Sequence, residues 1–175
     1  MSGLRGLLSQ AFQVGYVTAD RAAAVACLSE TLGLSGWIEF DAEMDVDTVG
    51  DDGERKSIVA VAFARWGRMV IEVVEPRDGD VEVFRRLVPD DATLRMHHVG
   101  IRVPDLAFAR QTARSMGLAC ELSGRFEDQV QYAFIEATAR LGHHLELVQF
   151  SPQGWELIAG ILAGAPQEGH EHGGT

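Results

Sequence analysis

HVGIRVPD, at residues 98–105, repeats an earlier stretch of the sequence, QVGYVTAD at residues 13–20. The Val-Gly pair and the closing Asp recur at the same relative positions, and a helix-forming segment with a glycine near its end follows each copy. Asp is a favourable residue at the start of a helix, and Gly is favourable at its end. The sequence therefore predicts a strand and a capped helix, present twice, and such a repeat fixes the architecture.

A second pair of similar stretches follows the two helices. MVIEVVEP at residues 69–76 and HLELVQF at residues 144–150 each place a glutamate in an apolar run typical of a strand. In each half, other stretches of strand composition lie between the helix and this glutamate-containing strand. Each half is therefore predicted to be β-α-β-β-β. We expect an α+β fold in which two βαβββ modules form a curved, cupped mixed β-sheet with helices on its outer face. The acidic stretch at residues 41–54 is expected to be a solvated hairpin loop.

The repeat also divides the chain. Its 175 residues suit one compact domain, or two small modules that share a core. The predicted segments are an N-terminal extension at 1–10, a first module at 11–76, a linker at 77–95, a second module at 96–150, a C-terminal helix at 151–165 and a mobile tail at 166–175.

Composition narrows the classes of partner. The chain has 26 acidic and 15 basic residues, a formal charge of -11, which repels polyphosphate and disfavours nucleic acid as a partner. It has no apolar run of about 18 residues, so we expect no membrane-spanning segment. The first residues lack the apolar stretch of a signal peptide, and we expect a cytoplasmic protein.

Alternate side chains of a strand share a face, and this parity selects candidate site residues. In the strand that holds His98, the apolar set Val99, Ile101 and Val103 would face the helix. His98 and Arg102 would then lie on the opposite face. His97 would point toward the helix by the same count, and we expect no role for it.

The same count in the other strands places potential ligands in matched positions. Glu146 and His144 share the non-helix face of the last strand, and Glu72 and Gln13 occupy equivalent positions in the first half. A carboxylate within an apolar strand is costly to bury unless it is paired or bound to a metal. Each residue alone has ordinary structural explanations, but as a set Gln13, Glu72, His98 and Glu146 predict a metal site.

These residues give the chain a family resemblance. The paired halves, HHVGIRVPDL at residues 97–106 and LGHHLELVQF at residues 141–150 resemble the vicinal oxygen chelate superfamily. That superfamily includes glyoxalase I, methylmalonyl-CoA epimerase, extradiol dioxygenases, fosfomycin-modifying transferases and bleomycin-binding proteins. The resemblance covers residues 11–152. It implies a metal held by one residue from the first strand and one from the last strand of each half, here Gln13, Glu72, His98 and Glu146.

The ligand types separate the activities within this superfamily. The set is similar to that of glyoxalase I and close to that of the epimerases, whereas Gln13 replaces a histidine that the dioxygenases need. Three oxygen ligands and one imidazole suit zinc, nickel, cobalt, manganese or magnesium with open positions. The resemblance implies a metal-dependent lyase or isomerase that transfers a proton through a metal-stabilised enolate on a small oxygen-chelating substrate. Glu146 would be the mobile base, and Glu72 could return the proton.

Several questions stay open at the level of sequence. Arg102 and His144 are candidates for substrate binding, the arginine toward an anionic group. An alternative function is that of a metal-free protein that binds or sequesters a small molecule, as bleomycin-resistance proteins do, with Trp37, Trp66 and Phe134 in the cup. A third is a structural module with a vestigial site. Superfamily members often pair their modules, so we also expect a homodimer.

Overall fold

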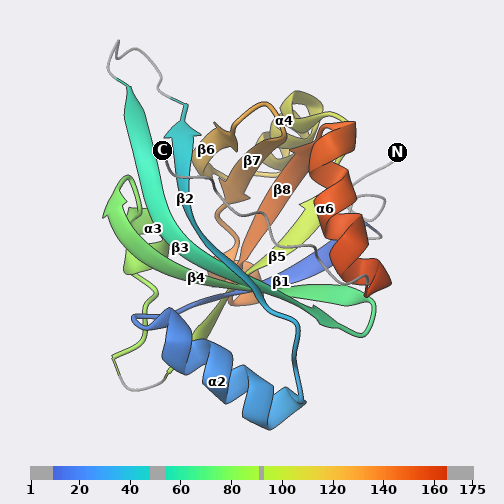
Figure 1. Cartoon of the computed structure of the whole chain (residues 1–175). Coiled ribbons are helices and arrows are strands. Elements are labelled where there is room, and N and C mark those ends of the chain that lie inside the picture. The colour runs from blue at the N-terminus through green and yellow to red at the C-terminus, as the bar shows by residue number, and fades with distance from the viewer. Residues whose placement is uncertain (1–9, 48–53, 91–92, 165–175) are drawn as a thin grey trace.

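The computed structural model describes residues 10–47, 54–90 and 93–164. It contains eight strands and five helices within these ranges (Figure 1). The predicted N-terminal extension, apart from Gln10, and the predicted tail lie outside the described residues. The elements in chain order are β1 (Ala11–Val17), α2 (Arg21–Leu32), β2 (Ile38–Val46), β3 (Arg55–Trp66), β4 (Met69–Gly79), α3 (Glu82–Arg85), β5 (Arg95–Arg102), α4 (Leu106–Ser115), β6 (Cys120–Phe126), β7 (Val130–Ile135), α5 (Thr138–Leu141), β8 (His144–Phe150) and α6 (Pro152–Ala163).

The strands form one closed sheet in the order β1-β4-β3-β2-β6-β7-β8-β5. Strand β1 pairs in parallel with β4, and β5 pairs in parallel with β8, while the other pairs are antiparallel. The two halves meet along β1 and β5 on one side and along β2 and β6 on the other. The predicted α+β fold with a curved mixed sheet is confirmed, and the curvature is strong enough to close the sheet.

Helices α2 and α4 cover the outer face on opposite sides of the molecule (Figure 1). Asp20 and Asp105 cap their N-termini by accepting hydrogen bonds from the Ala23 and Phe108 amides. Helix α2 buries small and branched apolar side chains chiefly against outward residues of β4 and β3, and α4 does so chiefly against β8 and β7. The predicted helix side of the sheet is thus the outer side, and the opposite parity faces the interior. The described residues contain no helix with the length and apolar character that crossing a membrane requires.

Two other helices close the interior. Helix α6, which Ser151 caps, packs Ile158 and Ile161 against Phe12 and other inward residues. The short helix α3 buries Phe84 in the cluster at the other end of the interior. Both ends of the closed sheet are therefore covered with apolar side chains.

The prediction of a solvated hairpin loop at residues 41–54 was wrong for residues 41–46, which belong to β2, and residues 48–53 lie outside the described part of the chain. Strand β2 continues to Val46, and its exposed side contacts β3, with Lys56 Nζ 3.2 Å from Glu43 and 2.7 Å from Asp45. The inward side chains of this stretch include Met44, which packs in the core. Acidic and apolar residues alternate here because one face of the strand meets solvent and the other meets the interior.

Two β-bulges change strand parity where the halves meet. On β1 the extra residue is Phe12, just before Gln13, and on β5 it is His97, just before His98. The bulge turns the side chain of His97 inward, beside that of His98, where both are buried. Counting along an ideal strand placed His97 on the helix side, and the extra residue is the reason that this expectation was wrong.

Candidate metal centre

Four side chains from four neighbouring strands meet inside the closed sheet. They are Gln13 of β1, Glu72 of β4, His98 of β5 and Glu146 of β8. Gln13 Nε2 lies 2.7 Å from Glu72 Oε2, 3.1 Å from His98 Nε2 and 3.3 Å from Glu146 Oε2. His98 Nε2 lies 3.0 Å from Glu72 Oε2 and 3.3 Å from Glu146 Oε2. The structure therefore brings together all four of the residues that the sequence predicts as ligands.

The geometry of this set fits a small divalent ion. Neighbouring ligands of an octahedral ion, each about 2.1 Å from it, lie about 3.0 Å apart, and the contacts that Gln13 and His98 make with each other and with the two carboxylates, 2.7–3.3 Å, are close to that. Two carboxylates and an imidazole offer donor atoms that lie within 4.8 Å of one another. Gln13 directs its amide nitrogen to the carboxylates, and a half-turn of the terminal amide would present its oxygen instead. Glu72, His98 and Glu146 thus form a candidate metal site that Gln13 completes.

The glycine of each repeat makes room for a side chain of the centre on the facing strand. A Cβ on Gly15 would lie 1.9 Å from His98 Cε1, and a Cβ on Gly100 would lie 2.8 Å from Gln13 Cβ. Gly15 pairs with His98, and Gly100 pairs with Gln13, across the β1–β5 junction. The Val-Gly motif that marks the repeat therefore has a steric reason, because each half supplies both a side chain of the centre and the space for the other half's side chain.

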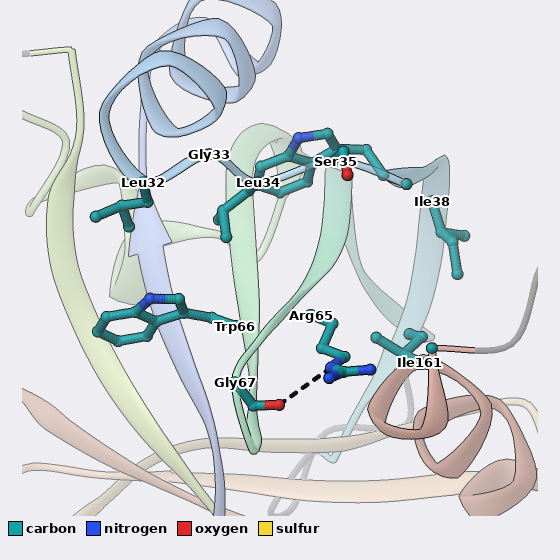
Figure 2. Close-up of a pocket in the computed structure, with 12 residues that line it drawn as sticks. Leu32, Gly33, Leu34, Ser35, Ile38, Arg65, Trp66, Gly67 and Ile161 are labelled. Atoms are coloured by element: carbon teal, nitrogen blue, oxygen red, sulfur yellow. Dashed lines mark hydrogen bonds between the residues drawn. The ribbon is translucent and has the colours of Figure 1, made fainter.

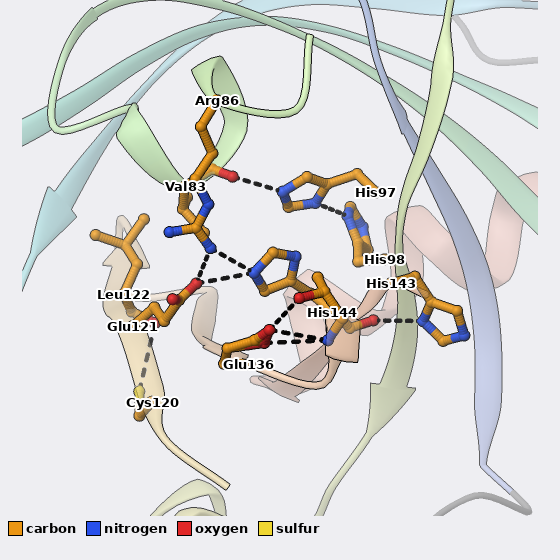
Figure 3. Close-up of polar contacts among 11 residues, drawn as sticks. Val83, Arg86, His97, His98, Cys120, Glu121, Leu122, Glu136, His143 and His144 are labelled. Carbon is orange, nitrogen blue, oxygen red and sulfur yellow. Dashed lines mark hydrogen bonds and ion pairs between the residues drawn. The ribbon is translucent and has the colours of Figure 1, made fainter. Parts of the chain in front are cut away.

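His97 determines which nitrogen of His98 faces the site (Figure 3). His97 Nε2 lies 2.9 Å from the Val83 carbonyl, which can only accept, so this nitrogen carries a hydrogen. Burial, together with the charge of His98, lowers the pKa of His97 to about 2, so the ring is neutral and its Nδ1 accepts. His98 Nδ1 lies 3.0 Å away and must donate to it. The remaining nitrogen of His98, Nε2, is left for the centre, and sequence parity missed this role of His97.

Burial and charge act in opposite directions on the titration of the centre. Burial disfavours a charged His98, but the carboxylates of Glu146 and Glu72 outweigh it and raise the pKa of His98 to about 10. Burial also raises the pKa of Glu72, and the neighbouring imidazole only partly offsets that effect. His98 is therefore protonated at neutral pH in the absence of a metal, and a bound cation would take the place of that proton.

The centre lies at the wall of an apolar cavity. A cavity of about 130 Å³ is lined by Gln13, Glu72 and Glu146 and otherwise mainly by aromatic and aliphatic side chains. A smaller cavity of about 40 Å³ adjoins the same two carboxylates. Tyr132 and Met44 line both cavities. Sequence reasoning did not select either residue, although the alternation of apolar and acidic residues in β2 was a usable signal for Met44.

The two residues predicted to bind substrate lie elsewhere. Arg102 is exposed, and its guanidinium carbon stacks 3.8 Å from the ring centroid of Trp155. His144 is buried and stacks on His97 at 4.7 Å, with its Nε2 2.8 Å from Glu121 and 3.0 Å from Arg86. Burial acts to raise the pKa of Glu121, but hydrogen bonds from Arg86 and His144 outweigh it and lower that pKa. Neither Arg102 nor His144 is among the described residues that line the cavities at the centre, and their roles remain predictions.

The three aromatic residues expected to line one cup lie in two different places. Phe134 lines the smaller cavity, but Trp37 and Trp66 line a different hollow of about 780 Å³. That hollow lies between the end of α2, the β3–β4 hairpin and α6, as the positions of Leu34, Trp66 and Ile161 show (Figure 2). The two tryptophans therefore do not contribute to the cavity beside the four converging side chains.

Comparison with known proteins agrees with this architecture. Residues 12–135 match the family model of the Glyoxalase/Bleomycin resistance protein/Dioxygenase superfamily. The chain belongs to this superfamily. The resemblance predicted from the repeat is thereby confirmed. A comparison with curated proteins gives no match.

Solved structures with the same fold include two epimerases. Methylmalonyl-CoA epimerase from Mycobacterium tuberculosis is 22% identical with a TM-score of 0.56, over 87% of this chain and 93% of that one. A hypothetical protein from Bacillus halodurans C-125 is 17% identical with a TM-score of 0.56, over 82% and 95%. A methylmalonyl-CoA epimerase in complex with methylmalonyl-CoA and NH4+ is 14% identical with a TM-score of 0.52, over 82% and 95%. At these identities the likeness shows the fold alone.

Proposed function

We propose that this protein is a metal-dependent isomerase or lyase that transfers a proton on a small substrate with two neighbouring oxygens. The observation that carries the proposal is the convergence of Gln13, Glu72, His98 and Glu146 at the wall of an otherwise apolar cavity. Such a set is costly to bury without a ligand, and two open positions suit an oxygen chelate. Membership of the superfamily and the fold shared with epimerases support the proposal.

Each of these residues would have its own role in the proton transfer. A divalent ion held by the four side chains would act as a Lewis acid on a substrate carbonyl and acidify the adjacent C–H bond. Glu146 would remove that proton, since its carboxylate both lines the cavity and lies at the centre. Glu72 would return a proton, because burial raises its pKa and so favours its protonated form. The apolar lining would exclude water, which strengthens these charge interactions.

The first experiment measures metal content and proton transfer together. The purified protein, incubated with zinc, nickel, cobalt, manganese or magnesium, is expected to hold about one ion per chain. Glu146→Gln should keep the ion but lower the rate of solvent-deuterium exchange into an enolisable substrate by about 10²- to 10⁴-fold. The Glu72→Ala, Glu146→Ala double variant should lose the ion. Suitable substrates to screen are hemithioacetals, acyl-CoA epimers and 2-hydroxyketones.

A glutamate on another strand provides the control. Glu43→Gln changes an exposed carboxylate of β2 that contacts Lys56 outside the cavity, and metal content and exchange should both be unchanged. Full activity of Glu146→Gln would contradict its role as the base. The same metal content in the parent and the double variant would show that the four residues are not the ligand set.

A second candidate function is metal-free binding of a small apolar molecule. One contact favours it: Gln13 Nε2 joins the two carboxylates directly, so the four side chains satisfy one another with no ion. The apolar cavity lining suits such a ligand as well. No retained metal under any of the loading conditions, together with binding of an apolar ligand without turnover, would favour this function.

A further inference from the structure

The cavity beside the centre has an unusual charge pattern. Of the described residues that line its two parts, only Glu72 and Glu146 carry a charge, and both are acidic. The remaining lining residues are apolar, apart from Gln13, Gln129 and Tyr132. A bound carboxylate or phosphate would find no arginine or lysine among these lining residues.

A metal at the centre does not reverse this pattern. The two carboxylates together carry the charge that neutralises one divalent ion, while Gln13 and a neutral His98 add none. Without a metal, His98 is the one basic group among the four converging side chains, so at most one positive charge faces two acidic groups. In both states an anionic ligand would lose hydration without gaining a net positive partner. The site therefore selects against negative charge.

One polar group of the lining is without a partner. The Tyr132 hydroxyl is buried, and no other group within the described part of the chain forms a hydrogen bond with it. Burial, with the nearby charge of Glu146, raises the pKa of Tyr132, so the group is a hydrogen-bond donor at neutral pH. Buried polar groups in native proteins almost always have a partner, and a lone one calls for an explanation. A bound ligand would supply the missing acceptor.

We infer that the site takes an uncharged compound in which two neighbouring oxygens are attached to a small aromatic or branched apolar group, with Tyr132 donating a hydrogen bond to it. The inference that the ligand has two chelating oxygens rests on the proposed function. The inferred charge and size of the ligand rest on the cavity itself. An apolar cavity of about 150 Å³ binds benzene. The larger cavity here, about 130 Å³, is close to that size and suits a group of one ring.

Two matched compounds test the charge preference. 2-Hydroxyacetophenone and mandelate both carry two neighbouring oxygens on a phenyl-bearing carbon skeleton, but mandelate is an anion at pH 7. Titration calorimetry on the full chain should show 2-hydroxyacetophenone binding at least ~10-fold more tightly, with and without added metal. Equal or tighter binding of mandelate, or no measurable binding of either compound, would overturn the inference.

Tyr132→Phe tests the hydrogen bond. The loss of a donor to a buried acceptor should weaken 2-hydroxyacetophenone binding by about 5- to 100-fold. Thermal stability should be unchanged or higher, because the hydroxyl has no partner in the free protein. Tyr16→Phe is the matched control, since Tyr16 packs on the outer face beneath α2 and should leave affinity unchanged. Unchanged affinity of Tyr132→Phe, or a loss of stability without a loss of affinity, would contradict the assignment.

Metal content of the same samples separates this inference from the proposed function. If metal binds but mandelate is preferred, the inference fails and the proposed function stands. If no metal binds but 2-hydroxyacetophenone is preferred and Tyr132→Phe weakens it, the ligand class stands and the metal-dependent activity fails.

Discussion

At the scale of single residues, the decisive contacts are those that orient His98 among the four converging side chains. The Val83 carbonyl fixes the hydrogen of His97, and His97 in turn fixes the hydrogen of His98. A ligand histidine whose second nitrogen is engaged keeps one tautomer and one ring orientation. The contact with His97 therefore fixes the ring orientation of His98, with its Nε2 directed to Glu72 and Glu146.

His97→Phe should weaken metal binding without unfolding the protein. Phe84 and Phe134 already contact the His97 ring, so a phenyl ring suits the site, but His98 Nδ1 loses its acceptor. Metal affinity, measured by competition with a chromophoric chelator, should fall by about 10- to 100-fold. His97→Gln, which restores an acceptor and a donor, should recover part of the loss.

A neighbouring histidine controls for the change of residue type. His143 is half-buried, and its Nδ1 contacts the carbonyl of His144 and not the centre. His143→Phe should therefore leave metal affinity unchanged. A fall in stability for His97→Phe with no change in affinity would mean that His97 acts only in packing.

At the scale of elements, the junction between β2 and β6 is the narrowest part of the closed sheet. Among the residues that the structure describes, two residue pairs form it, against six for β1 and β5. Arg125 Nε lies 2.9 Å from Asp45 Oδ2 across the junction, and Lys56 Nζ lies 2.7 Å from Asp45 Oδ1. The hydrogen bonds from Lys56 and Arg125 lower the pKa of Asp45.

This junction should weaken in acid. A group whose pKa is lowered by folding contributes stability above its unfolded pKa, about 3.9 for Asp, and the contribution is lost as pH falls through the folded value. The Asp47 amide, which donates to the Ser123 carbonyl at 2.8 Å, reports on the junction. Its hydrogen-exchange protection should drop between pH 5 and pH 3, whereas Asp45→Asn should show low protection at both. Equal pH dependence in the variant would rule out Asp45 as the cause.

The elements also show how far sequence reasoning extends. The repeat predicted the two modules and the inward parity of Gln13 and His98, because regular strands keep a period of two. It failed at His97, since a bulge adds a residue without a mark in the sequence. The expectation of a loop at Asp45 and its neighbours was wrong because the acidic residues there alternate with apolar ones, which is the pattern of a strand with one face in solvent. The cavity residue Tyr132 could not be found, since its importance depends on which other side chains leave it without a partner.

At the scale of the whole molecule, each half is incomplete alone. Gln13 and Glu72 come from the first half, and His98 and Glu146 from the second, so one chain assembles the entire centre. The extensive pairing of β1 with β5 joins the halves next to that centre. Dimer formation is not needed to complete the site, and the predicted homodimer remains a prediction.

The protein should therefore unfold in a single transition, and a bound metal should move that transition to higher urea concentration. Circular dichroism and tryptophan fluorescence should give coincident urea curves, because neither half keeps a closed sheet without the other. An ion at 100 times its dissociation constant should add about 2.7 kcal/mol to the free energy of unfolding. The double variant Glu72→Ala, Glu146→Ala should show no such shift. Two separate transitions, or an equal shift in the variant, would contradict this coupling.

The bulge at His97 has a consequence for how such chains diversify. Because the pairing of β5 with β1 is regular immediately before and after His97, loss of this one residue should leave Gly15 opposite His98 and Tyr16 opposite Met96. Descendants of one ancestral gene can thus gain or lose the supporting imidazole in one step, with the barrel and the four inward side chains inherited intact. The contact that orients His98 can thus change in evolution while the four converging side chains stay the same.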